Sequence, residues 1–340
     1  MRNKKRLASV IAGMGALVFA LCQQPFMHVY FENVKGRQGP EAMPVFNQQG
    51  SAAQVSLKDK ATAQERMDAI RREAARLHIP PIDAKLDRVW KAIPGYNGRE
   101  VDVDRSFQLS KDWIPGQKLP LVFREIPPKI TLDDLGAHPI YKGNPNKPMV
   151  SLMINVAWGN EFIPGMLETL ERENVKATFF LDGKWLSKNV EMAKVIASKG
   201  HEMSNHAYSH KNMSGLGRAE AIQEIVKTEN LLKEHLGVEN KLFAPPSGDF
   251  NQQTVKIAAE LNLRTVLWTI DTVDWKKPSP QTIITKIANR LEPGAMILMH
   301  PTESASLSLP EMIREIKSRD LVLGTVSELL STDRVPENES

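Results

Sequence analysis

Hydrophobic residues in the second half of the chain alternate between short continuous runs and longer stretches with helical spacing. The runs are rich in β-branched and aromatic residues, as in strands buried on both faces. The predicted strands are 150–156, 177–181, 201–206, 241–244, 264–270, 295–300 and 321–325. The predicted helices between them include 162–173, 185–198 and 219–236. This alternation predicts an α/β fold with a parallel sheet and helices outside it, most economically a (β/α) barrel.

The first 62 residues have a different pattern. A basic head precedes an apolar run over residues 7–22, so we predict a signal peptide or a membrane anchor over 1–27 and an exported protein. Residues 28–62 are polar and without periodicity, which predicts a flexible linker.

Residues 63–146 are expected to form a small α+β N-terminal region followed by a segment that wraps the next domain. Apolar residues at helical spacing predict one helix from residue 63 and a second over 84–93. Val101 and Val103 alternate with acidic residues as in a strand, and 119–123 reads as another. The stretch PGYNGREVDVD is loosely similar to small wall-binding modules of exported bacterial proteins; a structural appendage of the main domain is the alternative.

The charge balance and the cysteine content limit the kinds of ligand that the folded part can bind. The net charge of +4 comes from the four basic residues of the head, because no Asp or Glu precedes Glu32 and the remaining charges balance. Such a balance excludes a general affinity for nucleic acid. The only cysteine is Cys22 in the leader. Any metal held by the folded part must therefore bind to His, Asp or Glu.

Polar residues stand where the predicted strands end, which in a barrel is where reactive side chains lie. His206 and His210 are four residues apart and could converge on one divalent cation. His300 closes an apolar strand, and Asp271 could hold its tautomer for a general acid. The alternative is that these are ordinary loop residues and a satisfied core histidine.

Residues 149–331 resemble the polysaccharide deacetylase family, the NodB homology domain of carbohydrate esterase family four. The matching motifs are His206, His210 and Ser214; the D-x-x-D-W motif from Asp271 to Trp275; and the L-x-H motif from Leu298 to His300. The resemblance implies a distorted (β/α) barrel over 147–332, followed by a polar tail over 333–340. It also implies removal of acetyl groups from N-acetylglucosamine polymers such as peptidoglycan, with a bound divalent metal, usually zinc. The implied roles are metal binding by His206 and His210, catalysis by His300 and Asp271, and substrate binding by Trp275, Leu298, Pro246 and Ser247.

Two motifs depart from the family pattern. Asn155 stands where the family has its catalytic base, and Val156 stands where it has a third metal ligand. Ala244 replaces the arginine that orients the base. An amide cannot deprotonate water, and loss of general-base help costs about 100- to 10,000-fold in rate. Val156 cannot bind a metal, so the two imidazoles would lack an anionic partner.

The resemblance implies a bacterial member of the cell-wall or sporulation type, and three hypotheses follow for its function. The first is a glycan de-N-acetylase whose base is replaced by Asp249, by Asp182 or by the substrate itself. The second is a module that binds wall glycan without efficient turnover. The third is a scaffold for other wall or sporulation proteins. A membrane contact would come through the N-terminal segment if that segment is not cleaved.

Overall fold

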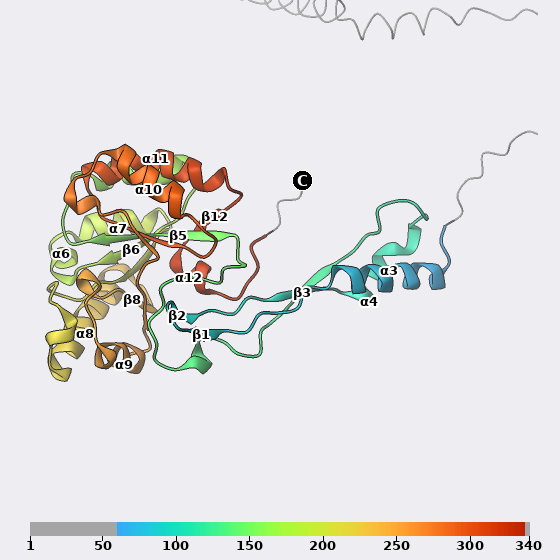
Figure 1. Cartoon of the computed structure of the whole chain (residues 1–340), viewed down its shortest axis with the longest axis horizontal. Helices are drawn as coiled ribbons and strands as arrows, with labels where there is room; N and C mark the ends of the chain where they lie inside the picture. The colour runs from blue at the N-terminus through green and yellow to red at the C-terminus, as the bar shows by residue number, and fades with distance from the viewer. Residues whose placement is uncertain (1–59, 337–340) are drawn as a thin grey trace, which may run out of the picture. The chain divides into compact units, whose positions relative to one another are not determined.

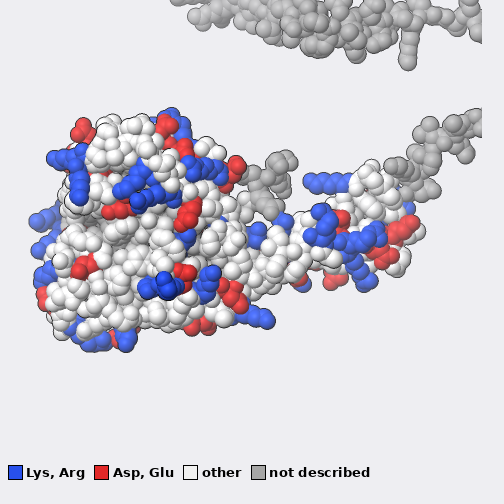
Figure 2. All heavy atoms as spheres, in the orientation of Figure 1, with Lys and Arg blue, Asp and Glu red and all other residues white. Residues whose placement is uncertain are grey.

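A computed structural model describes residues 60–336 of the chain. The predicted leader over 1–27 and residues 28–59 of the predicted linker lie outside the described residues. Within the described part, no helix is long and apolar enough to cross a membrane. Acidic and basic side chains are interspersed over the face shown in Figure 2, in line with the balanced charge of the sequence.

Eight parallel strands form the main sheet, which confirms the predicted (β/α) architecture. The strands are β5 (Met149–Val156), β6 (Thr178–Leu181), β7 (Glu202–Asn205), β8 (Leu242–Phe243), β9 (Arg264–Thr265), β10 (Ile270–Asp271), β11 (Met296–Met299) and β12 (Val322–Gly324). Their order is β10-β11-β5-β6-β7-β8-β9, with β12 beside β5. All eight residues of β5 are buried, because this strand has neighbours on both sides and packing on both faces.

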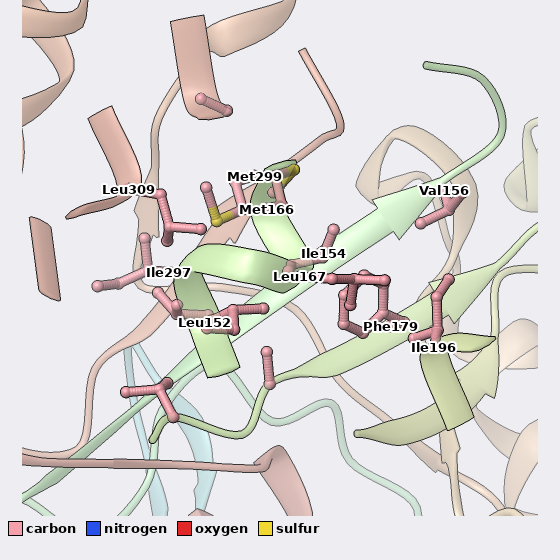
Figure 3. Packing of buried hydrophobic residues seen from close by; sticks show 14 of the residues in the cluster. Leu152, Ile154, Val156, Met166, Leu167, Phe179, Ile196, Ile297, Met299 and Leu309 are labelled. Atoms are coloured by element: carbon pink, nitrogen blue, oxygen red, sulfur yellow. The ribbon is translucent and has the colours of Figure 1, made fainter. Parts of the chain in front are cut away.

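Helices surround this curved sheet (Figure 1). They are α5 (Ile163–Arg172), α6 (Gly183–Lys188), α7 (Val190–Ser198), α8 (Arg218–Leu236), α9 (Gln252–Glu260), α10 (Pro280–Arg290), α11 (Glu303–Lys317) and α12 (Val326–Leu330). Alternate residues of β5 pack against them, as Figure 3 shows for Leu152 and Ile154 beside Leu167 of α5, and Val156 belongs to the same cluster. The opposite residues of β5 face the barrel interior, where Met153 packs in a second apolar cluster.

Two predicted elements of the barrel are each divided in the structure. The predicted helix over 185–198 is interrupted at Asn189, whose φ of −130° and ψ of 37° are not helical. The predicted strand over 264–270 was wrong in its middle. There the chain changes partners, since the N–H of Leu267 donates to Ile140 whereas that of Thr269 donates to Met296.

The N-terminal region is a small α+β arrangement. Its elements are α3 (Ala63–Leu77), β1 (Lys85–Asp87), β2 (Lys91–Ile93), β3 (Gly98–Val101), α4 (Val103–Leu109) and β4 (Phe123–Ile126). The predicted helix over 84–93 was wrong. The Asp87 carboxylate accepts hydrogen bonds from the N–H groups of Val89 and Trp90, which forms a turn and makes this segment a hairpin. The predicted strand ends before Val103, because Asp102 caps α4.

Residues 140–142 close the sheet between its two ends. Ile140 pairs with Val266 beyond β9, and Lys142 pairs with Ala295 before β11. The buried Lys142 ammonium lies 2.6 Å from the Glu292 carboxylate, which anchors the segment. Residues 140–142 therefore link the segment after β9 to the segment before β11.

Candidate functional site

A cavity of about 410 Å³ opens at the carboxyl ends of the strands. Its lining residues are Asn155, Trp158, His206, His210, Ser247, Trp268, Asp271, Trp275, Leu298 and His300. Eight of these ten residues were predicted from the sequence. Pro246 is buried and does not line the cavity, and its contact with substrate stays a prediction. Val156 is also buried, in the apolar cluster beneath the helices.

A second cavity, of about 610 Å³, lies at the opposite ends of the strands. It is lined by residues just before β8 and at the start of β9, together with part of segment 132–140. Arg264 in its wall pairs with Asp133 at 2.6 Å. None of the predicted site residues lines this cavity, so the chemistry has to be sought at the strand carboxyl ends.

Helix α8 fixes the loop that carries the two predicted metal ligands. Glu224 of α8 accepts hydrogen bonds from the N–H groups of Tyr208 and Ser209 and from the Ser209 hydroxyl. Asn205, at the end of β7, donates to Glu229 of the same helix. These partly buried bonds hold a loop in which His210 has a φ of +56°. As a result the ring centroids of His206 and His210 are only 5.2 Å apart, as their spacing predicts.

The protonation state of His206 follows from its partners. Its Nδ1 lies 2.7 Å from the carbonyl oxygen of Ala244. A carbonyl oxygen only accepts, so Nδ1 carries the proton and Nε2 is left as an acceptor. Burial, together with the neighbouring His210 and His300, lowers the pKa of His206 to about 3. Burial also lowers the pKa of His210. Both imidazoles are therefore neutral at physiological pH.

Asn155 occupies the place next to His206 where the resemblance puts the catalytic base. Its Nδ2 lies 3.4 Å from His206 Nε2, the remaining acceptor of that ring, and so donates to it. The amide oxygen must then point away from the ring, and this oxygen is buried without a partner. A buried, unpaired acceptor costs about 1–3 kcal/mol. The side chain at this position therefore holds a histidine and has no means of accepting a proton.

The residues present do not fit a metal centre of the kind the resemblance implies. Among residues 60–336, no group of three or more His, Cys, Asp or Glu side chains is placed to hold a metal ion. His206 and His210 are close enough to share an ion, but the Asn155 amide faces the Nε2 atom that would bind it. Val156 offers no donor atom, whereas a catalytic zinc has three protein ligands.

His300 pairs with Asp274, and the prediction that Asp271 holds its ring was wrong. The Nδ1 of His300 lies 2.8 Å from one oxygen of Asp274, and its backbone N–H donates to the other oxygen at 2.6 Å. Asp271 instead accepts a hydrogen bond from the N–H of Val273. Val273 has a φ of +57°, unusual for a β-branched residue, and this turn brings Asp274 back to His300. Asp274 is fully buried, so its carboxylate is shielded from water, whereas His300 is partly exposed to the cavity.

The two carboxylates considered as replacement bases lie outside the cavity lining. Asp249 accepts hydrogen bonds from the backbone and the hydroxyl of Ser214, which also accounts for that motif residue. Asp182 caps α6 by accepting from the N–H of Trp185, and burial raises its pKa to about 6. Both side chains have structural partners that explain them. Neither lies among the residues that would contact a ligand in the cavity.

Sequence reasoning missed two tryptophans of the cavity. Trp158 stacks on His300 with a centroid distance of 5.4 Å and an interplanar angle of 13°. Trp268 lies between β9 and β10, against Gly248, where a Cβ atom would approach the indole to 2.7 Å. Trp158 comes only three residues after Asn155 and is followed by a glycine, which was the available signal. Trp268 was assigned to a strand, and its position gave no signal of a site.

A parallel barrel with two histidines and an Asp–His pair at its strand ends is the arrangement that the sequence motifs suggested. Residues 142–266 match the family described as polysaccharide deacetylase. A peptidoglycan-N-acetylglucosamine deacetylase of Bacillus cereus is 35% identical over 199 residues, which cover 57% of this chain and 72% of that protein. The chain belongs to the polysaccharide deacetylase family.

Three further comparisons extend over more of the chain. The uncharacterized protein YlxY of Bacillus subtilis is 40% identical over 310 residues, covering 91% of this chain and 96% of that protein. The structure of wild-type BA3943, described as a CE4 family pseudoenzyme from Bacillus anthracis, is 42% identical, with a TM-score of 0.74 over 79% of this chain and 96% of that one. A BA3943 mutant described as having restored enzymatic activity is 40% identical, also with a TM-score of 0.74, over 79% of this chain and 99% of that one.

Proposed function

We propose that this chain is a non-catalytic member of its family that binds N-acetylglucosamine-containing cell-wall glycan in the cavity at the strand ends. The observation that carries the proposal is Asn155 beside His206, at the position of the base. An amide orients a ligand or a water but does not remove a proton, and the missing base alone costs about 100- to 10,000-fold in rate. Neither Asp182 nor Asp249 lines the cavity to replace it.

The rest of the cavity is suited to binding a neutral, hydroxyl-rich ligand. Its volume of about 410 Å³ is within the range of small-molecule sites. No Lys or Arg lines it, so nothing in its walls favours a phosphate or a carboxylate. Three tryptophans and several polar side chains share the lining, which is the mixture that a sugar ring requires. The relatives named as peptidoglycan deacetylases support a wall glycan as the ligand.

The proposal also includes where the protein is located and how much metal it binds. We place the protein outside the cytoplasm at the bacterial cell wall, exported by the predicted leader over 1–27, which would be either cleaved or kept as an anchor. The boundaries at 63, 147 and 333, and a wall-binding role for the N-terminal region, stay predictions. Zinc stays a prediction as well, and we expect uptake well below one ion per chain because two neutral imidazoles lack a third ligand.

Binding and turnover have to be measured on the same preparation of the full chain. We expect chitooligosaccharides to bind in calorimetric titration and insoluble peptidoglycan to retain the protein, with no acetate released above a heat-inactivated blank. Replacing Trp275 by Ala should weaken binding. Absence of binding would reject the proposal. Acetate release that disappears in His300→Ala would show instead that the chain is an enzyme.

A further inference from the structure

Two tryptophans stand out on the surface of the described chain. Trp158 is 45% exposed and Trp275 is 52% exposed, whereas the other tryptophans are buried or half-buried. Both exposed indoles line the same cavity. An exposed large aromatic surface is costly in water and commonly marks a binding site when it borders a cavity.

The backbone around Trp158 is held firmly. Gly159 has a φ of +83°, and a Cβ atom there would lie 1.9 Å from the carbonyl oxygen of Pro301, so only glycine fits this approach. Asn160 accepts a hydrogen bond from the Trp185 indole N–H at 2.6 Å and donates to Asn189 at 2.6 Å. The exposure of Trp158 is therefore imposed by the fold.

The neighbours of the indole define the chemistry that it can recognise. One face of Trp158 lies flat on His300, and His210 lies edge-on at a centroid distance of 6.4 Å. Because Nδ1 of His300 is occupied by Asp274, only its Nε2 is left for a ligand hydroxyl. The indole offers a flat apolar surface next to these polar groups. A pyranose ring has the matching form, with C–H groups on one face and hydroxyls around its edge.

We propose that Trp158 is a specificity-determining residue that stacks against the ring of an N-acetylated hexosamine bound next to His300. This inference rests on the proposed function and adds to it the residue that selects the ligand. Trp158 is not part of the motifs that carried the resemblance.

The test compares apolar side chains with and without an aromatic face at position 158 by titrating the full chain with N-acetylglucosamine tetramer. Trp158→Leu keeps an apolar side chain without an aromatic face, and we expect it to weaken binding by at least about 10-fold. Trp158→Phe restores an aromatic face and should bind within about threefold of the wild type. Trp113→Ala, which removes a tryptophan outside the cavity, should leave binding unchanged.

The outcomes separate this inference from the proposal beneath it. If Trp158→Leu binds as tightly as the wild type while Trp275→Ala binds weakly, the cavity holds glycan but Trp158 does not select it. Equal losses in the Leu and Phe variants would also overturn the inference, since an aromatic face would then be irrelevant. If the wild type binds no tetramer, the proposed function fails and this inference fails with it. Equal thermal midpoints of the variants would establish that folding is unaffected.

Discussion

The two sides of the cavity differ in charge: one contains a buried carboxylate, and the other contains only neutral groups. On the side of β10 and β11, here called the acid side, His300 and a fully buried Asp274 form a pair that shares two hydrogen bonds. On the side of β5 and β7, here called the base side, a neutral His206 faces the amide of Asn155, and Val156 lies in the apolar core. A buried carboxylate is stable only when it is paired, whereas a neutral amide can be buried at a smaller cost.

This difference shows that the cavity has lost only part of its chemistry. The acid side retains a histidine held in one tautomer, which is what a general acid needs. The base side has no carboxylate to take a proton from water and no anionic group to bind a cation. Catalysis needs both sides at once, but glycan binding does not. The comparison predicts large effects where charge is restored or removed and small effects where neutral groups are exchanged.

The largest effect is expected from restoring charge to the base side. The double variant Asn155→Asp, Val156→Asp, loaded with zinc, should release acetate from chitooligosaccharides at least about 100-fold faster than the wild type. Ala244 and Val156 are both fully buried. Ala244 is left unchanged because an arginine there would overpack the core, whereas aspartate is no larger than the valine that it replaces and its charge would be paired with zinc. Zinc content measured by mass spectrometry should rise towards one ion per chain.

The control for this variant is the triple variant that also carries His300→Ala, in which the gained activity should disappear. A folded, zinc-loaded double variant that releases no acetate would contradict the view that only the base side is deficient.

Removing charge from the acid side should cost stability. Asp274→Ala leaves two N–H donors of His300 without their partner, and we expect the free energy of unfolding to fall by about 3 kcal/mol. Urea titration measures the change. Asp271→Asn is the matched control, because an amide oxygen can still accept the hydrogen bond from Val273. Equal losses in the two variants would mean that the pairing of Asp274 with His300 makes no particular contribution to the free energy of unfolding.

The neutral His206 on the base side should make the free energy of unfolding depend on pH. The pKa of His206 falls from 6.5 to about 3 on folding, so the unfolded chain binds more protons between these values. The stabilisation from neutral His206 is therefore complete above pH 6.5 and is lost as the pH falls towards 3. This residue contributes a slope of up to about 1.4 kcal/mol per pH unit.

The variant His206→Gln cannot gain that proton, so its free energy of unfolding should fall less steeply than that of the wild type between pH 6.5 and pH 4. Urea titrations of both proteins across this interval give the two slopes. Identical slopes would show that His206 is protonated equally in the folded and unfolded chains.

The smallest effect is expected at Asn155 itself. Asn155→Leu removes an unpaired buried oxygen together with one long hydrogen bond to His206, so the two contributions oppose each other. We expect the free energy of unfolding to change by less than about 1 kcal/mol, measured by urea titration. A loss comparable with that of Asp274→Ala would mean that the base side contains a tight polar network after all.

Regular periodicity made the barrel predictable. The predicted strand 150–156 corresponds to Met149–Val156 and the predicted helix 219–236 to Arg218–Leu236, because each is long enough for its pattern to dominate. The segment 84–93 was mistaken for a helix because its apolar spacing is satisfied by a hairpin around the Asp87 turn. Short segments are decided by such local hydrogen bonds, which a hydrophobic pattern does not encode.

The site was predictable as a set of residues but not in its pairings. Strand ends gather polar residues in any parallel barrel, so His206, His210 and His300 could be placed together from their order alone. Whether Asp271 or Asp274 bonds to His300 depends on the left-handed backbone of Val273. A β-branched residue does not predict this conformation, so the sequence could not identify the partner. Trp158 was missed for the same kind of reason, since the contact of Gly159 with Pro301 fixes its direction.

The pairing of Ile140 with Val266 bears on where this protein can be shortened. The match to the family begins at residue 142, two residues after Ile140. A chain trimmed to that boundary would lose the hydrogen bonds that Ile140 exchanges with Thr265 and Leu267, and would expose an unsatisfied strand edge prone to self-association. The smallest independently stable barrel should therefore begin upstream of Ile140. Its first residue thus lies before residue 142, where the match to the family begins.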